Sequence, residues 1–237
     1  MSVIWHDLEC GGYVEDLPLW RALADRYGDP ILDIGAGTGR TALDLAGRGH
    51  AVTALDRDPK LVAELRRRAS AIELATVLAD AREFDLGRRF ALCLVPMQTI
   101  QLLGGATGRA DFLRCAHRHL QDGGVLAVAL TDTLELYEVP AGSPVPLPDI
   151  CERDGVVYSS QPTAVRADWG GFVLERRRET VSADGQLSVS HDMIRLDRLG
   201  PVQLEREAAE VGFTPAGRAS VASTDAYVGS VVVMLSA

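Results

Sequence analysis

The stretch that decides the fold is Ile31-Leu32-Asp33-Ile34-Gly35-Ala36-Gly37-Thr38-Gly39-Arg40. Its first four residues predict a short buried strand, and the glycines that follow allow a tight turn and a close approach of the backbone to a ligand. In an open α/β sheet, ligands bind at the carboxyl ends of the strands. The stretch therefore predicts the first strand of such a sheet and a ligand-binding loop.

Two residues of this stretch argue against a dinucleotide as the ligand. The dinucleotide fingerprint is G-x-G-x-x-G, whose third glycine falls where this chain has Arg40. Asp33 precedes the first glycine by two residues, and a carboxylate is a poor neighbour for a pyrophosphate but a good partner for an ammonium group. A nicotinamide-dependent oxidoreductase is therefore kept only as an alternative.

Strands and helices alternate from residue 31 to residue 130. Apolar runs predict further strands at 51–55, 74–79, 90–95 and 125–130, and helical periodicity predicts helices at 38–47, 59–69 and 109–120. Such alternation implies right-handed crossovers and a mostly parallel sheet.

The pattern changes after residue 130. Four prolines at 140–149 predict a loop, and residues 155–199 predict an antiparallel meander with a hairpin turn at Ala183-Asp184-Gly185. A helix at 202–211 and strands at 213–221 and 227–235 follow. Because no linker separates these parts, we expect a single domain over residues 1–237, with an N-terminal cap segment at 1–28 and a lid insertion at 135–199.

Composition and charge restrict the classes of function. Hydrophobic residues make up 47% of the chain, enough for a large core, and a net charge of −9 disfavours binding to nucleic acid. No apolar stretch approaches the roughly 20 residues that span a bilayer, so no membrane association is expected. The cysteines lack metal-ligand spacing and no signal peptide is evident, which predicts a cytoplasmic protein without a metal site.

The stretch at residues 31–40 resembles motif I of the class I S-adenosylmethionine (SAM)-dependent methyltransferases, of the bacterial type that acts on small molecules. The resemblance covers residues 31–130 and extends more loosely to the end. It implies a Rossmann-like α/β fold with a seven-stranded, mostly parallel sheet in the order 3-2-1-4-5-7-6, the last strand antiparallel, and an antiparallel β insertion after strand five. It implies SAM as the cofactor, with its methionine half beside Asp33, Gly35, Ala36, Gly37 and Gly39.

Acidic residues also end the second and third predicted strands. A carboxylate at Asp56 can accept hydrogen bonds from both ribose hydroxyls. The resemblance assigns the adenine ring to Asp80 and the Ala81 amide. Arg57 and Arg82 are candidates to flank the adenosine. Each acid can instead be a helix cap or a surface charge, and both arginines can be solvated surface residues.

The fourth predicted strand leads into Pro96-Met97-Gln98. The resemblance places Pro96 and Met97 against the sulfonium and the incoming substrate. The Asn/Asp-Pro-Pro-Tyr motif of enzymes that methylate nucleobases or glutamine side chains is absent. Gln98 and Gln101 can orient a ligand or can form hydrogen bonds with the backbone.

Two further residues are candidates outside the parallel sheet. His191 is the best-placed titratable group of the predicted lid, although a histidine there can equally be a hydrogen-bonded core residue. Tyr13 can close on the methionine end of the cofactor, whereas Trp20 suits core packing. The catalytic candidates are therefore His191, Gln98 and Tyr13.

The expected function is transfer of the SAM methyl group to a nitrogen or oxygen of a small-molecule acceptor. Displacement at a sulfonium mainly requires alignment of the reactants and exclusion of water. An amine needs no strong base, whereas a hydroxyl benefits from one. A non-catalytic SAM-binding protein is the main alternative, and a nicotinamide-dependent oxidoreductase is a weaker one.

Overall fold

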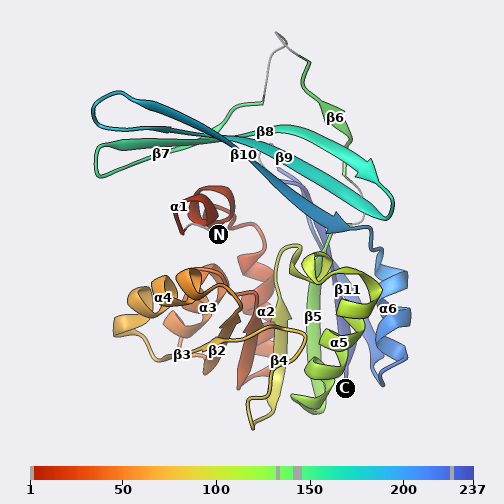
Figure 1. The fold of residues 1–237 in the computed structure, drawn as a ribbon. Helices are drawn as coiled ribbons and strands as arrows, with labels where there is room; N and C mark the ends of the chain where they lie inside the picture. The colour runs from red at the N-terminus through yellow and green to blue at the C-terminus, as the bar shows by residue number, and fades with distance from the viewer. Residues whose placement is uncertain (1–2, 132–133, 141–145, 225–226) are drawn as a thin grey trace. The chain divides into compact units, whose positions relative to one another are not determined.

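The computed structural model describes the chain except for residues 1–2, 132–133, 141–145 and 225–226 (Figure 1). The chain folds into two units. The Rossmann-like unit consists of residues 1–3, 13–132 and 199–237, and the insertion unit of residues 4–12 and 133–198.

The Rossmann-like unit is built on a seven-stranded sheet in the order β11-β12-β5-β4-β1-β2-β3. Its strands are β1 (Ile31–Ile34), β2 (Val52–Asp56), β3 (Leu74–Leu78), β4 (Phe90–Val95), β5 (Leu120–Leu130), β11 (Thr214–Val221) and β12 (Ser230–Ser236). The first five pair in parallel, and β12 is antiparallel to both of its neighbours. The predicted order 3-2-1-4-5-7-6 is therefore confirmed.

Helices cover both faces of this sheet. They are α2 (Leu17–Tyr27), α3 (Arg40–Gly47), α4 (Pro59–Arg68), α5 (Gly105–Arg118) and α6 (Pro201–Ala209), with short 3-10 turns η2 (Ala69–Ala71) and η3 (Thr99–Leu102). Because side chains alternate along a strand, Leu32 and Ile34 of β1 face a core shared with α5 and α6. Ile31 faces the other core, which α2 and α3 complete. Asp33 points to that second side, as Ile31 does.

The insertion unit contains the predicted antiparallel meander. Its strands are β6 (Tyr137–Glu138), β7 (Asp149–Arg153), β8 (Val156–Asp168), β9 (Gly171–Val181) and β10 (Leu187–Asp197). The sheet order is β10-β9-β8-β6, with β7 also paired to β8. The N-terminal helix α1 (Val3–His6) continues as a π-helical turn, η1 (Asp7–Gly11).

Several predicted elements differ from the structure in their bounds, and not every strand was predicted. The helix expected at 38–47 begins at Arg40, because Gly39 before it has φ +101°. The helix expected at 109–120 begins at Gly105, four residues earlier. Strand β7 was not predicted, because its exposed residues show no apolar alternation. Within the described residues, none of the helices combines the length and apolar character needed to cross a bilayer.

Candidate functional site

The loop after β1 depends on glycine at two positions. Gly35 has φ +70° and Gly39 has φ +101°, which are left-handed conformations that other residues rarely adopt. A Cβ atom on Gly35 would lie 2.6 Å from Cγ2 of Thr99, and one on Gly39 would lie 2.3 Å from Cδ1 of Leu65. The loop therefore fits closely between η3 and α4, and a larger residue would displace it.

Asp33 lies at the carboxyl end of β1 and is fully buried. Neither of its carboxylate oxygens has a hydrogen bond of ordinary geometry within the described residues. Burial raises the pKa of Asp33 to about 7, with the nearby Arg40 opposing that shift and Asp56 and Asp16 adding to it. A buried carboxylate without a partner is costly, so this site is suited to a cationic ligand.

Arg40 links the glycine loop to the segment before α2. Its guanidinium binds both carboxylate oxygens of Asp16, with Nη2 donating to Oδ2 at 2.8 Å. It also donates to the Tyr13 carbonyl at 2.9 Å and lies 5.2 Å from the centre of the Tyr13 ring. Asp16 accepts a further hydrogen bond from Nε1 of Trp20 at 2.7 Å. From the sequence, Arg40 was noted only as the residue that stands where a dinucleotide fold has its third glycine. Its pairing with Asp16 was not predictable, because no local sequence pattern indicates a contact between residues 24 positions apart.

Tyr13 is a catalytic candidate that lies near the glycine loop, through its contact with Arg40 at the end of that loop. The residue is 5% exposed, and its ring lies 5.0 Å from that of Tyr227. Its hydroxyl is buried without a hydrogen bond of ordinary geometry among the described residues, and burial raises its pKa. Tyr13 and Asp33 therefore both interact with Arg40, and each has a buried polar group without a hydrogen bond of ordinary geometry among the described residues.

Asp56 connects the end of β2 to the glycine loop. Its Oδ2 accepts a hydrogen bond from the Gly37 amide at 2.8 Å, and its Oδ1 accepts one from the Asp58 amide at 2.8 Å. Each oxygen has a second lone pair, so the carboxylate can still accept hydrogen bonds from ribose hydroxyls. The neighbouring Arg57 is exposed.

Asp80 follows β3 and forms an ion pair with Arg82. Nε and Nη2 of Arg82 donate to the two carboxylate oxygens at 2.9 and 2.6 Å, and these hydrogen bonds lower the pKa of Asp80 to about 2. Ala81, between them, is buried. The adenine role of Asp80 and Ala81 stays a prediction, in which an adenine amino group would share the carboxylate with Arg82.

The end of β4 has an unusual backbone. Met97 has φ +55°, in the left-handed region where non-glycine residues are strained and often functional. Pro96 before it is buried, and its carbonyl accepts a hydrogen bond from the Thr99 hydroxyl at 3.0 Å. Gln98 is half-buried. Gln101 has the backbone role that the sequence left open, because its amide exchanges two hydrogen bonds of 2.9 Å with the Thr131 backbone.

His191 lies on an exposed face of the insertion unit. It stands on β10 opposite Arg177 of β9, so both belong to the same face of the sheet. Arg178 and Asp192 next to them point to the opposite face, where Arg178 binds Glu9. A catalytic role for His191 stays a prediction, as do the lid role of residues 135–199 and the cap role of residues 1–28.

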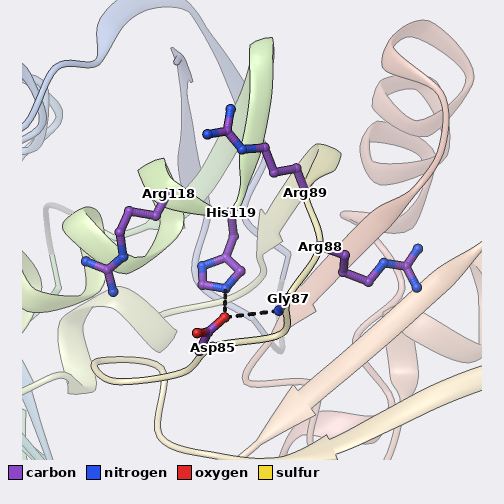
Figure 2. Close-up of a pocket in the computed structure, with 6 residues that line it drawn as sticks. All are labelled: Asp85, Gly87, Arg88, Arg89, Arg118 and His119. Carbon is purple, nitrogen blue, oxygen red and sulfur yellow. Dashed lines mark hydrogen bonds and ion pairs between the residues drawn. The ribbon is translucent and has the colours of Figure 1, made fainter.

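A hollow lined mostly by basic residues lies at the amino ends of the parallel strands, whereas the glycine loop lies at their carboxyl ends. It is formed where the chain enters β4 and β5, by Asp85, Gly87, Arg88, Arg89, Arg118 and His119 (Figure 2). Figure 2 shows the three arginines pointing away from one another. Nδ1 of His119 donates to the Cys115 carbonyl at 2.8 Å, and its Nε2 accepts from the Leu86 amide at 3.0 Å. His119 therefore stabilises this loop, and the hollow offers no convergent binding groups.

The glycine loop and the strands after it lie within a family domain. Residues 31–124 match the family model of a methyltransferase domain. This stretch is therefore similar to a methyltransferase domain, over less than half of the chain. The family resemblance seen at residues 31–40 is thereby confirmed. Within the part of the chain that the structure describes, no group of three or more His, Cys, Asp or Glu side chains is placed to hold a metal ion.

One curated relative is similar to about half of the chain. It is a probable cobalt-precorrin-6B C(15)-methyltransferase (decarboxylating) from Methanothermobacter thermautotrophicus, which is 33% identical over 118 residues. The matched region is 46% of this chain and 58% of the relative. The chain therefore spans little more than half the length of that relative.

Several solved structures share the fold over nearly the whole chain. A SAM-bound amino pentose methyltransferase of calicheamicin biosynthesis from Micromonospora echinaspora is 20% identical with a TM-score of 0.73, covering 100% of this chain and 97% of that one. A sugar N-methyltransferase from a Streptoalloteichus species is 19% identical with a TM-score of 0.75, covering 98% and 91%. These similarities confirm the Rossmann-like methyltransferase fold.

Proposed function

We propose that the chain binds SAM beside the glycine loop and transfers its methyl group to a small-molecule acceptor. The observation that carries the proposal is the buried carboxylate of Asp33, which has no hydrogen bond of ordinary geometry among the described residues. The methionine end of SAM bears an ammonium group, and an ammonium is the partner that a buried carboxylate lacks here. A pyrophosphate at the same place would be repelled by Asp33.

The residues around the loop fit the remaining parts of the cofactor. We assign the methionine half to Asp33 with the backbone of Gly35, Ala36, Gly37 and Gly39, and the ribose hydroxyls to Asp56. Asp80, Ala81 and the exposed Arg57 would lie along the adenosine, and Pro96 and Met97 beside the sulfonium. When bound, SAM supplies an activated methyl group on a good leaving group.

For the acceptor atom we propose a nitrogen. Two supports are the structural neighbours described as an amino pentose methyltransferase and a sugar N-methyltransferase, whose similarity includes the insertion. A neutral amine attacks the methyl group directly and loses a proton only after the N–C bond has formed, so no strong base has to be found among Tyr13, Gln98 and His191. The chain then has to align the amine with the methyl group and exclude water.

Calorimetry and an acceptor screen test the two parts of this proposal. Titration with SAM and S-adenosylhomocysteine should release binding heat, whereas NAD should give none. Heat with NAD alone would contradict the cofactor assignment. Incubation with SAM and a panel of amino sugars, matched with the corresponding hydroxyl sugars, should yield S-adenosylhomocysteine only with the amines. SAM binding without turnover on any panel would favour a non-catalytic SAM-binding protein. The cytoplasmic location and the absence of a nucleic-acid partner stay predictions from the sequence.

A further inference from the structure

A second buried acid of the Rossmann-like unit, Asp16, lies just before α2 and is 1% exposed. Its two carboxylate oxygens accept hydrogen bonds from Nη1 and Nη2 of Arg40, the second at 2.8 Å. Nε1 of Trp20 also donates to Oδ2 of Asp16 at 2.7 Å, and Trp20 is itself fully buried. Asp16 is therefore held in one orientation, and it holds the Arg40 guanidinium in turn.

Arg40 is the cation that acts on Asp33 at the end of β1. Burial raises the pKa of Asp33 most, and among nearby charges Arg40 lowers it whereas Asp56 and Asp16 raise it. The Arg40 guanidinium nevertheless donates to Asp16 and to the Tyr13 carbonyl. Neither oxygen of Asp33 has a hydrogen bond of ordinary geometry among the described residues. An arginine that could neutralise Asp33 is thus directed to another carboxylate.

The direction of the Arg40 side chain decides what Asp33 can bind. A guanidinium pairs with a carboxylate through two parallel hydrogen bonds, and a buried pair of this kind is strong and poorly screened by solvent. If Arg40 paired with Asp33, the ammonium group of a ligand would have to displace it before binding. A second carboxylate that retains Arg40 removes this competition.

We propose that Asp16 is a positioning residue for cofactor binding, which holds Arg40 away from Asp33 and so keeps the Asp33 carboxylate available for the ammonium group of SAM. This inference rests on the proposed SAM site. Asp16 acts without touching the cofactor, because its contacts are with Arg40 and Trp20. Its charge, rather than its bulk, is the property that matters.

Asp16→Asn tests this role by calorimetric titration with SAM. Asparagine keeps the size of the side chain and an oxygen that can accept from Trp20, but it loses the charge that retains Arg40. Arg40 is then free to pair with Asp33. The apparent Kd equals the intrinsic Kd divided by the fraction of competent molecules, so it rises about tenfold if about one molecule in ten keeps Asp33 unpaired.

A double variant, Asp16→Asn with Arg40→Gln, separates this role from a merely structural one. The freed guanidinium is removed together with the carboxylate that retained it, so Asp33 is again available and the Kd should return most of the way to the wild-type value. Replacing both partners of a buried ion pair is generally tolerated better than removing one. The double variant therefore decides the matter even if Asp16→Asn alone does not fold, since loss of SAM binding in the folded double variant would overturn the inference.

Asp44→Asn is the matched control. Asp44 on α3 pairs with an arginine of α2, because Nε and Nη2 of Arg21 donate to its carboxylate at 2.8 and 2.6 Å. The control is thus the same substitution in a second two-pronged ion pair of these helices, about one helical turn beyond Arg40. Its Kd for SAM should stay at the wild-type value.

The ionisation of Asp33 in the ligand-free protein gives a second measurement. The charged or titratable groups that act on Asp33 or are acted on by it are Arg40, Asp16, Asp56 and Cys93 of β4. Carboxyl carbon NMR of aspartate-labelled protein, assigned with Asp33→Asn, should show a pKa of about 7 for Asp33 in the wild type. That pKa should be lower in Asp16→Asn, because Arg40 then stabilises the ionised carboxylate. The dependence of SAM affinity on pH below 7 should flatten in the same variant.

The outcomes separate this inference from the proposed function. Wild-type protein that binds SAM, with Asp16→Asn binding it equally well, would overturn the inference and leave the SAM site intact. A raised Kd without a lowered pKa of Asp33, or a double variant that binds as weakly as Asp16→Asn, would also overturn it, because either would show a purely structural pair. Wild-type protein that fails to bind SAM would overturn both.

Discussion

At the scale of the residue, Asp33 at the end of β1 links protonation to ligand binding. The Asp33 carboxyl group is buried with a pKa near 7, so it is largely protonated in mildly acidic solution. An ammonium ligand binds the ionised form, and binding below that pKa therefore has to release a proton. The charge of Asp33 is then set jointly by pH and by the ligand.

We predict that SAM affinity rises with pH up to about 7. Below that pKa the ionised fraction of Asp33 falls tenfold per pH unit, so the Kd should fall roughly tenfold from pH 5.5 to pH 6.5. Asp33→Asn, which cannot ionise, should bind SAM much more weakly and without this slope. Isothermal calorimetry across this pH range in both proteins checks the prediction. An unchanged slope in Asp33→Asn would place the titrating group elsewhere.

The glycine loop allows a second prediction at the residue scale. Gly35→Ala should destabilise the fold and abolish SAM binding, because φ is +70° there and the new Cβ would lie 2.6 Å from Thr99. A left-handed non-glycine residue alone costs about 1 kcal/mol, before any displacement of Thr99. Gly47→Ala is the matched control, since it lies in α3 with no atom within 4 Å of the new Cβ. It should be neutral or stabilise the protein slightly in thermal unfolding.

At the scale of elements, the features that were predicted correctly are those that depend on local sequence patterns. The strand β1, the glycine loop and the acids at the ends of β2 and β3 all follow from apolar runs and the residues that end them. The roles of Arg40 and Glu9 were not predictable, since each acts on a partner far away in the sequence. Strand β7 was not predicted, because its sequence does not alternate between apolar and polar residues. Asp80 was correctly placed at a strand end, but its ion pair with Arg82, which lowers its pKa to about 2, was not predicted.

Gln101 illustrates an element contact with a measurable contribution to stability. Its side chain joins η3 to the end of β5 through two hydrogen bonds with the Thr131 backbone, and it is 1% exposed. Gln101→Leu should lower the free energy of unfolding by about 2–3 kcal/mol, because two buried backbone groups lose this partner. Gln121→Leu, at an exposed position of β5, should change it by less than about 0.5 kcal/mol. Urea denaturation of both variants measures the two changes in the free energy of unfolding. Equal changes would show that the hydrogen bonds of Gln101 do not stabilise the fold.

At the scale of the whole molecule, buried carboxyl groups act on stability in opposite directions. Burial raises the pKa of Glu9, but hydrogen bonds from Arg178 and Ser160 outweigh it and leave that pKa below its usual value. For Glu207, burial is likewise outweighed by its hydrogen bond with Arg109. Stability from such lowered pKa values is present above about pH 4.5 and is lost as the pH falls through the native pKa. Asp33 behaves oppositely, because its native pKa is raised.

The ligand-free chain should therefore be most stable near pH 5 rather than at neutral pH. Between about pH 4 and pH 7 an unfolded Asp33 is ionised while the native one holds its proton, so the free energy of unfolding falls as pH rises, by about 4 kcal/mol if the whole shift is expressed. Above pH 7 this contribution levels off. Asp33→Asn should remove the decline, and saturating SAM should oppose it in the wild type by pairing the ionised carboxylate. Melting temperatures measured from pH 4 to pH 8, with and without SAM, test all three expectations. A wild-type maximum at pH 7 or above would mean that Asp33 is ionised in the free protein, and the ligand-free site would then have to contain a counter-charge for it.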